Sequence, residues 1–544
     1  MIPRRQVKPA VSMLVWCVGG VLCVQTAAVA GPIEMRPGRK QLFLDDFVVQ
    51  QISGLRRTMH RPTKRGAVLR PDIPSDGSLV QIRSAPMWVP DEQVYKLIYI
   101  AYTMDDHSTI GPALALSKDG VRWDKPQLGQ MAVRGSTKNN RIVIDPKLRW
   151  PSNAFENVIY DPDDPDPSRR YKGLLGAQGR VPVVSPDGVH WKKLDVPTIP
   201  SSDESQLVHD REHGRFLAML KTSNEYGRAF SISISKDFVN WTKNRFLFGA
   251  DAEDQPLALA FIRNRLVDPG LARPVFVDPD PAVGWTPPAG KTAHPAWRAE
   301  CYNIAVFPYE GIYIGLLMMY YPTGTCLPDR RNTDGFDLIQ LAMTRDLVHW
   351  RRLGGRQPFI GPSRVDGGLV GVYDRGQLCV TNQPVERGDE LWFYYTGLKW
   401  RSNPYKLNTD GSPRDPKTLS PRERADRRDG WGAACLAVLR RDGFISLDAG
   451  RKPGYVLTRP LKLAGHRLFV NLDAPDGEAL VEILDAQGQP IRDFARTQAV
   501  AVRGDAVRLP VQWKSNSDLV PLAGKTVQMK IHLARARLYA FWTE

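Results

Sequence analysis

This 544-residue sequence contains repeated segments, and acidic and polar residues recur near the first apolar run of each repeat. The catalytic candidates are Glu300, Glu204, Asp366 and Asp46, and the candidates for substrate binding are Arg83, Asn153, Glu156, Gln206 and Asn303. Carboxyl groups that converge on one cleft cannot all ionise freely, because burial and mutual repulsion raise some of their pKa values. One protonated and one ionised carboxyl group are what the cleavage of a glycosidic bond needs. The plainer interpretation of any one of these acids is that it caps a strand or binds a basic loop.

A seven-residue pattern, [ST]-x-D-x-V-x-W, indicates how these residues are positioned. It occurs at Ser117–Trp123, Ser185–Trp191, Ser235–Trp241 and Thr344–Trp350, with a weaker copy at Arg440–Phe444. Its aspartate is expected to accept hydrogen bonds from backbone amides in a turn, and its tryptophan to pack between neighbouring repeats. Self-similarity at a spacing of tens of residues is typical of a repeat architecture.

Strand patterns around each heptapeptide predict an all-β fold. Each copy follows an apolar strand, and another strand precedes that one, so the unit has four antiparallel strands, as in a propeller blade. We predict a five-bladed β-propeller over residues 31–454 and a C-terminal β-sandwich over residues 455–544. The first strand of each blade lines the propeller channel, which is why the candidate residues are expected to converge.

The N-terminus has the pattern of a secretory signal peptide over residues 1–30. Arg4, Arg5 and Lys8 precede an apolar stretch, and Ala28-Val29-Ala30 forms a cleavage site. We therefore expect a secreted or periplasmic protein with no membrane span in the mature chain and no nucleic-acid partner. The formal net charge of +16 allows a carbohydrate partner that is anionic.

No sequence pattern calls for a cofactor or a metal ion. His209-Asp-Arg-Glu-His213 matches the H-x-x-E-H pattern of a zinc protease, but it falls where a strand-turn-strand unit is expected and not on a helix. The four cysteines beyond residue 30 form no CxxC pair. P-loop, GxSxG and dinucleotide-binding glycine patterns are not found.

The sequence resembles the five-bladed propeller glycoside hydrolases of families 32, 43, 62 and 68, most of all secreted bacterial proteins related to family 32. The resemblance rests on Phe43-Leu-Asp-Asp46, on the heptapeptides, and on the tail segments Val481–Ile491, Val511–Trp513 and Leu519–Leu522. Family 32 enzymes use an aspartate nucleophile, an aspartate in R-D-P and a glutamate acid in E-C. Glu300-Cys301 matches the E-C motif, whereas Arg414-Asp415-Pro416 lies in a long loop and the nucleophile motif is absent. The resemblance implies Glu300 as general acid. Asp46 or Asp76 as a substitute nucleophile and Glu204 as a substitute middle acid do not follow the family pattern, so Glu204, Asp366 and Asp46 are candidates for base, nucleophile or a group that tunes a pKa.

Together these features predict a secreted glycoside hydrolase that cleaves an oligo- or polysaccharide by carboxylate chemistry in the propeller funnel. The alternative is a non-catalytic glycan-binding propeller, which would bind sugars through the same polar groups. A structural or surface-interaction protein is the third candidate.

Overall fold

The computed structural model describes residues 31–544 except 104–105, 150, 283, 286–293 and 329–331. The predicted signal peptide, residues 1–30, lies outside the described residues. Strands dominate this part of the chain, and its two α-helices are α1 (Asp254–Val267) and α2 (Pro421–Arg428). None of the described helices is long and apolar enough to cross a membrane. The all-β class predicted from the sequence is thereby confirmed.

Three antiparallel sheets of the propeller follow one another along the chain. Their strands are, in order, β10 (Phe155–Tyr160), β11 (Tyr171–Leu175), β12 (Val181–Ser185) and β13 (Lys192–Lys193); β14 (Ser205–Asp210), β15 (Arg215–Asn224), β16 (Gly227–Ser235) and β17 (Arg245–Gly249); and β20 (Glu300–Tyr309), β21 (Ile312–Thr325), β22 (Thr333–Thr344), β23 (Trp350–Arg352) and β24 (Pro358–Ile360). Between the second and third sheets lie α1 and a small hairpin of β18 (Gly284–Trp285) and β19 (His294–Pro295).

A fourth, nine-stranded sheet joins the beginning and the end of the propeller. One part consists of β6 (Leu79–Gln81), β7 (Met87–Val89), β8 (Val94–Thr103) and β9 (Asp106–Ser117), and the other of β25 (Gln377–Val380), β26 (Val385–Arg387), β27 (Glu390–Leu398), β28 (Gly432–Arg440) and β5 (Thr63–Leu69). The two parts meet at a parallel bridge between Gly432 and Leu79. Because β5 pairs with β28, the sheet also links segments far apart in sequence. The predicted propeller is confirmed, whereas the count of five blades stays a prediction.

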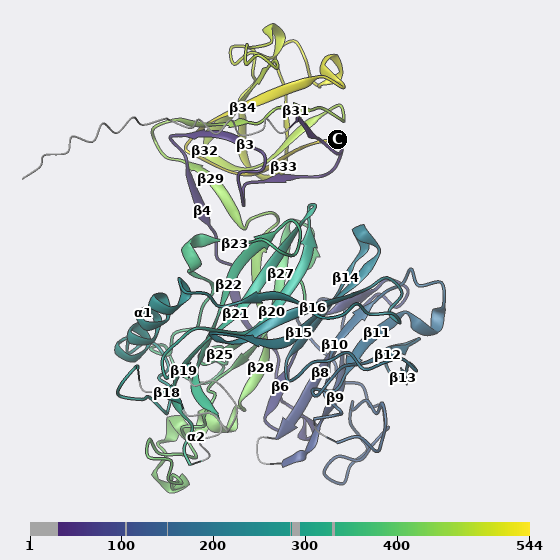
Figure 1. Cartoon of the computed structure of the whole chain (residues 1–544), viewed down its shortest axis with the longest axis vertical. Helices are drawn as coiled ribbons and strands as arrows, with labels where there is room; N and C mark the ends of the chain where they lie inside the picture. Colours follow the sequence, from purple (N-terminus) through teal and green to yellow (C-terminus); the bar gives the residue numbers. More distant parts are fainter. Residues whose placement is uncertain (1–30, 104–105, 150, 283, 286–293, 329–331) are drawn as a thin grey trace, which may run out of the picture.

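The C-terminal β-sandwich includes strands from the start of the described chain. Its eleven-stranded sheet contains β1 (Ile33–Glu34), β2 (Gln41–Leu42), β3 (Val49–Ser53) and β4 (Arg56–Met59), with β29 (Ile445–Ala449), β30 (Gly454–Thr458), β31 (Leu461–Lys462), β32 (Leu468–Leu484), β33 (Val502–Val511), β34 (Thr526–Ala534) and β35 (Ala536–Thr543). Figure 1 shows the purple β3 and β4 beside the green and yellow C-terminal strands, with the propeller below. Phe43 packs against Phe541 in the core of this unit. The domain boundary drawn between residues 454 and 455 stays a prediction.

The repeated heptapeptide forms the turns that the sequence predicts. In the first copy, the Asp119 carboxylate accepts hydrogen bonds from the backbone N–H groups of Val121 and Arg122, each at 2.8 Å. The same two bonds recur at the other three aspartates: Asp187, Asp237 and Asp346. Trp350 packs between sheets, as expected from the sequence, and meets Phe248 of β17 at 5.7 Å between ring centroids, whereas the ring of Trp191 meets Phe155 of its own sheet at 4.6 Å. The repeat therefore stabilises the fold and takes no part in the candidate chemistry.

These turns predict that part of the stability depends on acidic pH. Burial alone would raise the pKa of Asp187, but hydrogen bonds from His190 and from the Val189 and Ser185 groups lower it to about 2. A carboxyl group whose pKa is lower in the folded state stabilises the fold above its unfolded pKa of about 3.9, and this stabilisation is lost as the pH falls to 2. Asp187→Ala is expected to lower the free energy of unfolding at pH 7 by about 1–2 kcal/mol.

Urea unfolding at pH 7 and at pH 2 measures this effect, and the deficit of Asp187→Ala should shrink at pH 2. Asp91→Ala, at an exposed position, is the matched control and should change little at either pH. An equal deficit at both pH values would mean that the charge of Asp187 is irrelevant to the turn.

Candidate active site

A polar cluster lies where the innermost strands β14 and β20 begin. We use this name for the side chains of Arg83, Asp203, Glu204, Lys221, Arg228, Arg298, Glu300, Tyr302, Asn303, Tyr320, Asp337 and Arg401, which the contacts described below connect. The cluster reaches the surface through Asp203 and Arg228, whose side chains are 55% and 28% exposed. Its residues lie on, or directly beside, strands of three sheets, so the propeller fold itself brings them together.

Glu204 is held in the cluster by a buried ion pair. The guanidinium of Arg83 donates to both of its carboxylate oxygens, at 2.5 and 2.6 Å, and Asn303 donates to Oε2 at 2.9 Å. Burial alone would raise the pKa of Glu204, but the charges of Arg83, Lys221 and Arg180 lower it to about 2. Three residues selected from the sequence thus meet, and their contacts connect three different sheets.

Glu300 is enclosed by two arginines. Its Oε2 accepts 2.7 Å from Arg228 Nη1, and its Oε1 forms an ion pair with Arg298. A side chain at Gly227, whose φ is +119°, would place its Cβ 2.7 Å from the Glu300 carboxyl carbon, so this position needs glycine. Burial alone would raise the pKa of Glu300, but the two arginines lower it to about 2. The two arginines therefore favour the ionised carboxylate of Glu300, whereas the general-acid role expected from the sequence needs a protonated group, so that role stays a prediction.

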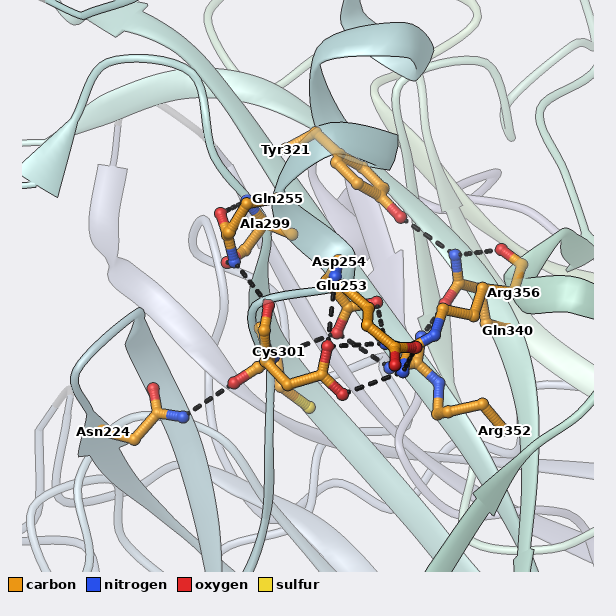
Figure 2. Close-up of polar contacts among 12 residues, drawn as sticks. Asn224, Glu253, Asp254, Gln255, Ala299, Cys301, Tyr321, Gln340, Arg352 and Arg356 are labelled. Carbon is orange, nitrogen blue, oxygen red and sulfur yellow. Dashed lines mark hydrogen bonds and ion pairs between the residues drawn. The ribbon is translucent and has the colours of Figure 1, made fainter. Parts of the chain in front are cut away.

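Helix α1 holds the backbone next to Glu300 in place. The side-chain amide of Gln255 accepts from the N–H of Ala299 at 3.0 Å and donates to its carbonyl at 3.3 Å. Figure 2 shows the contact between Gln255 and Ala299, together with the ion pairs of Asp254 at the start of α1. Asp254 pairs with Arg352 and with Arg356, both at 2.8 Å. These charges anchor α1 to the sheet of β20–β24, and through Gln255 they fix the start of β20.

Asp337 is a carboxyl group that the sequence analysis missed. In the register of neighbouring strands, Glu300 lies opposite Tyr320, and Tyr320 lies opposite Asp337, so the three side chains share one face of the sheet. Asp337 is 0% exposed; its Oδ2 accepts from Gln377 at 2.6 Å, and its buried Oδ1 has no hydrogen-bond partner among the described residues. Burial raises its pKa to about 7, against the lowering effect of Arg401 and Gln377. The sequence signal that could have identified Asp337 is an acidic residue within a strand, β22, whose other residues are all buried.

Asp203 is the most exposed carboxylate of the cluster. Its backbone is in the left-handed region at φ +49°, a strained conformation for a residue other than glycine. Its Oδ2 lies 3.6 Å from Lys221 Nζ, and Lys221 lies over the Tyr302 ring at 4.1 Å. Burial lowers the pKa of Lys221, against the raising effect of Asp203 and Glu204. Asp203 therefore presents a carboxylate to solvent beside a buried cation and an aromatic ring.

Two of the four predicted catalytic residues lie elsewhere. Asp366 is on an exposed loop, where it pairs with Arg364 at 2.8 Å. Asp46 pairs with Arg57 and Arg351, its side chain 58% exposed, because the segment around it belongs to the sandwich sheet and not to the first blade.

The other predicted binding residues do not join the cluster: those whose side chains are described form hydrogen bonds to backbone carbonyl groups elsewhere. Gln206 donates to the Val380 carbonyl at 3.0 Å and so crosslinks two innermost strands. Asn153 donates to Ile110 at 2.8 Å, in a pocket between β9 and β10. The Glu156 side chain lies outside what the structure describes. Asp76, named as a substitute nucleophile, is buried and bonded to Tyr99 and Lys125.

Among the described residues, no group of three or more His, Cys, Asp or Glu side chains is placed to hold a metal ion. The H-x-x-E-H segment does not form an α-helix: His209 is on β14, and His213 ends a short 3-10 turn. His213 instead contacts Asp210 at 3.0 Å.

A cavity of about 480 Å³ lies at the opposite ends of the same innermost strands, lined in part by Trp88, Tyr160, His209 and Glu212. We place the candidate chemistry in the polar cluster instead, because carboxyl groups with opposite pKa shifts lie there. Those of Glu300 and Asp337 are lowered and raised respectively.

Comparisons with known proteins give matches of low similarity only. No protein-family model and no curated protein matches the sequence. Among solved structures, one titled "Glycoside hydrolase" has a TM-score of 0.39 at 11% identity and covers 70% of this chain and 92% of its own. The Bombyx mori GH32 beta-fructofuranosidase BmSUC1 has a TM-score of 0.35 at 10% identity, covering 89% and 94%. An exo-beta-1,3-galactanase from Phanerochaete chrysosporium has a TM-score of 0.30 at 9% identity, covering 89% and 99%. These likenesses identify neither a substrate nor a reaction.

Proposed function

We propose that this protein is a glycoside hydrolase that cleaves an oligo- or polysaccharide at the polar cluster. The observation that carries the proposal is the row Glu300–Tyr320–Asp337, in which two carboxyl groups face the same side of one sheet in opposite environments. One is ion-paired with two arginines, and the other has an unpartnered oxygen. Carboxyl groups whose pKa values are pushed apart in this way are what acid–base cleavage of a glycosidic bond needs.

In this proposal Asp337 donates the proton to the leaving oxygen. Asp203, whose side chain is exposed and lies 3.6 Å from Lys221 Nζ, acts as the base or nucleophile. Glu300 and Glu204 stay ionised and hold the arginines in place. Because Asp337 is 0% exposed, side chains of the cluster must move when substrate binds. Residues 1–30 support secretion or a periplasmic location, where a carbohydrate and not a nucleic acid would be the partner.

One observation favours the alternative, a glycan-binding propeller without catalysis. Glu204 and Glu300 are the two predicted catalytic carboxylates that lie in the cluster. Each forms an ion pair with an arginine and is therefore not free to react with substrate. Such a protein would bind sugar through the same polar groups but would not need a protonated carboxyl group.

A release assay separates the two functions. The mature chain is incubated with neutral, uronic and sulfated polysaccharides, and new reducing ends are counted. Asp203→Asn is expected to lower the rate by about 100-fold or more, because it removes the charged carboxylate. The matched control is Asp505→Asn in the sandwich, since its side chain is 54% exposed and also ion-paired, against 55% for Asp203.

The control variant should release sugar at the parent's rate. Binding of a polysaccharide without release by the parent chain would establish the glycan-binding alternative. Equal rates in the parent and Asp203→Asn would remove Asp203 from the reaction.

A further inference from the structure

Arg401 is a cation of the polar cluster without an acidic partner in the described part of the chain. Its Nε donates to the Thr333 carbonyl at 2.7 Å, and its Nη2 donates to Asn332 Oδ1 at 3.0 Å. Its guanidinium lies over the rings of Tyr302 and Tyr320, at 5.2 and 4.8 Å from their centroids. These contacts are all to neutral groups, so they hold the charge in position without neutralising it.

Arg228 lies against the same two rings, at 5.2 Å from the centroid of Tyr302 and 5.4 Å from that of Tyr320. Its Nη2 is 3.4 Å from Asn332 Oδ1, the atom that also accepts from Arg401. The two guanidiniums therefore share two aromatic rings and one amide oxygen. Burial and the repulsion from Arg401 act to lower the pKa of Arg228, but Glu300 and Tyr302 raise it overall.

Nearby acids balance these charges only in part: Asp337, whose pKa burial raises to about 7, is an acid whose charge acts on Arg401. Glu300 is shared between Arg228 and Arg298, and the amine of Lys221 adds a further cation beside the Tyr302 ring. Arg228 remains 28% exposed, so a bound anion could reach it from solvent. Guanidiniums bind carboxylate and sulfate groups with two parallel hydrogen bonds, and such charged pairs are among the strongest polar contacts.

We propose that the glycan bound at the polar cluster carries an acidic group, a uronate carboxylate or a sulfate ester, which Arg401 and Arg228 bind together. This inference rests on the proposed function, because it assigns the substrate class of the same site. It also assigns two of the basic residues of this positively charged chain to the binding of an acidic ligand.

Calorimetric binding at low and at physiological salt tests the inference with two matched pairs of glycans. The first pair is oligogalacturonate and its fully methyl-esterified form, and the second is dextran sulfate and dextran. We expect the parent to bind at least one acidic glycan 10-fold or more tightly than its neutral counterpart, with an affinity that falls as salt rises. The pair that shows the preference distinguishes a carboxylate from a sulfate.

Two substitutions assign the preference to the arginines. Arg401→Gln should remove most of it, while Arg401→Lys should keep the salt dependence but lose part of the affinity, since an ammonium lacks the paired donors. Arg508→Gln is the matched control, because that side chain is 55% exposed and lies in the sandwich. Circular dichroism verifies folding, and if Arg401→Gln does not fold, Arg401→Lys and the parent's own preference decide.

The inference is overturned if neither acidic glycan is preferred, or if Arg508→Gln weakens binding as much as Arg401→Gln does. The outcomes separate it from the proposed function. An acidic preference without any release of sugar leaves this inference standing and removes the hydrolase. Release of sugar from neutral glycans, with no preference for acidic ones, supports the hydrolase and overturns this inference.

Discussion

Glu204→Gln is expected to lower the free energy of unfolding by about 3–5 kcal/mol, because it removes the carboxylate that forms a two-point ion pair with the buried Arg83 charge. The two side chains are 9% and 2% exposed, so water cannot take the place of the lost carboxylate. The substitution also changes an oxygen that accepts from Asn303. Since these contacts link separate sheets around the propeller axis, we expect the loss to affect the whole propeller. Urea unfolding followed by tryptophan fluorescence measures it.

Two controls show whether the buried charge is the cause. The double variant Arg83→Met, Glu204→Leu should recover most of the loss, because replacing both partners leaves no unpaired charge. Glu478→Gln breaks an exposed pair with Arg503 in the sandwich and should cost less than about 1 kcal/mol. The effect should also depend on pH. Because the pKa of Glu204 is lowered to about 2, its contribution is full above about pH 4.5 and is lost as the pH falls to 2. A loss below 1 kcal/mol at pH 7 would contradict the argument.

The parts of the fold that local chemistry determines were predictable from the sequence. The turn at Asp119 depends on hydrogen bonds from the backbone of residues two and three positions later, so a short sequence pattern is enough to predict this turn. Its recurrence with strands on either side then predicts the propeller. Placing polar residues at the first strand of each repeat also puts Glu204 and Asn303 in the same region, and they lie 2.9 Å apart.

Pairing between distant segments limited what the sequence could predict about the site. Asp46 precedes the first blade in sequence, but on either side of it Leu42 pairs with Ala540 and Val49 with Thr458, which no local pattern reveals. Asp337 joins the site through two steps of strand register, from Glu300 to Tyr320 and from there to β22. Arg298 is only two residues from Glu300, but the ion pair of Glu300 with Arg228 joins residues 72 positions apart, so its ionisation state was not predictable either.

Asp337→Asn is expected to reduce the rate of sugar release by about 100- to 10,000-fold, the usual contribution of a general acid, with little change in glycan binding. The carboxyl group loses its transferable proton, while the asparagine oxygen can still accept the hydrogen bond from Gln377. In the parent, burial raises the pKa of Asp337 to about 7. Release by the parent should therefore fall as the pH rises through about 7, because the proton donor becomes ionised. The measurement is a rate profile from pH 4 to 9 for both proteins.

Asp334→Asn tests whether any buried carboxyl group of this strand would have the same effect. Asp334 is 1% exposed and accepts from the backbone N–H groups of Val275 and Phe276 at 2.8 and 3.0 Å, so its role is to hold the chain. Its substitution can lower activity through stability, but it should leave the alkaline decline of the rate in place. In Asp337→Asn the residual rate should no longer decline near pH 7, since the group that titrates there is gone. A decline that persists in Asp337→Asn would mean that another residue donates the proton, and the row Glu300–Tyr320–Asp337 would then be structural.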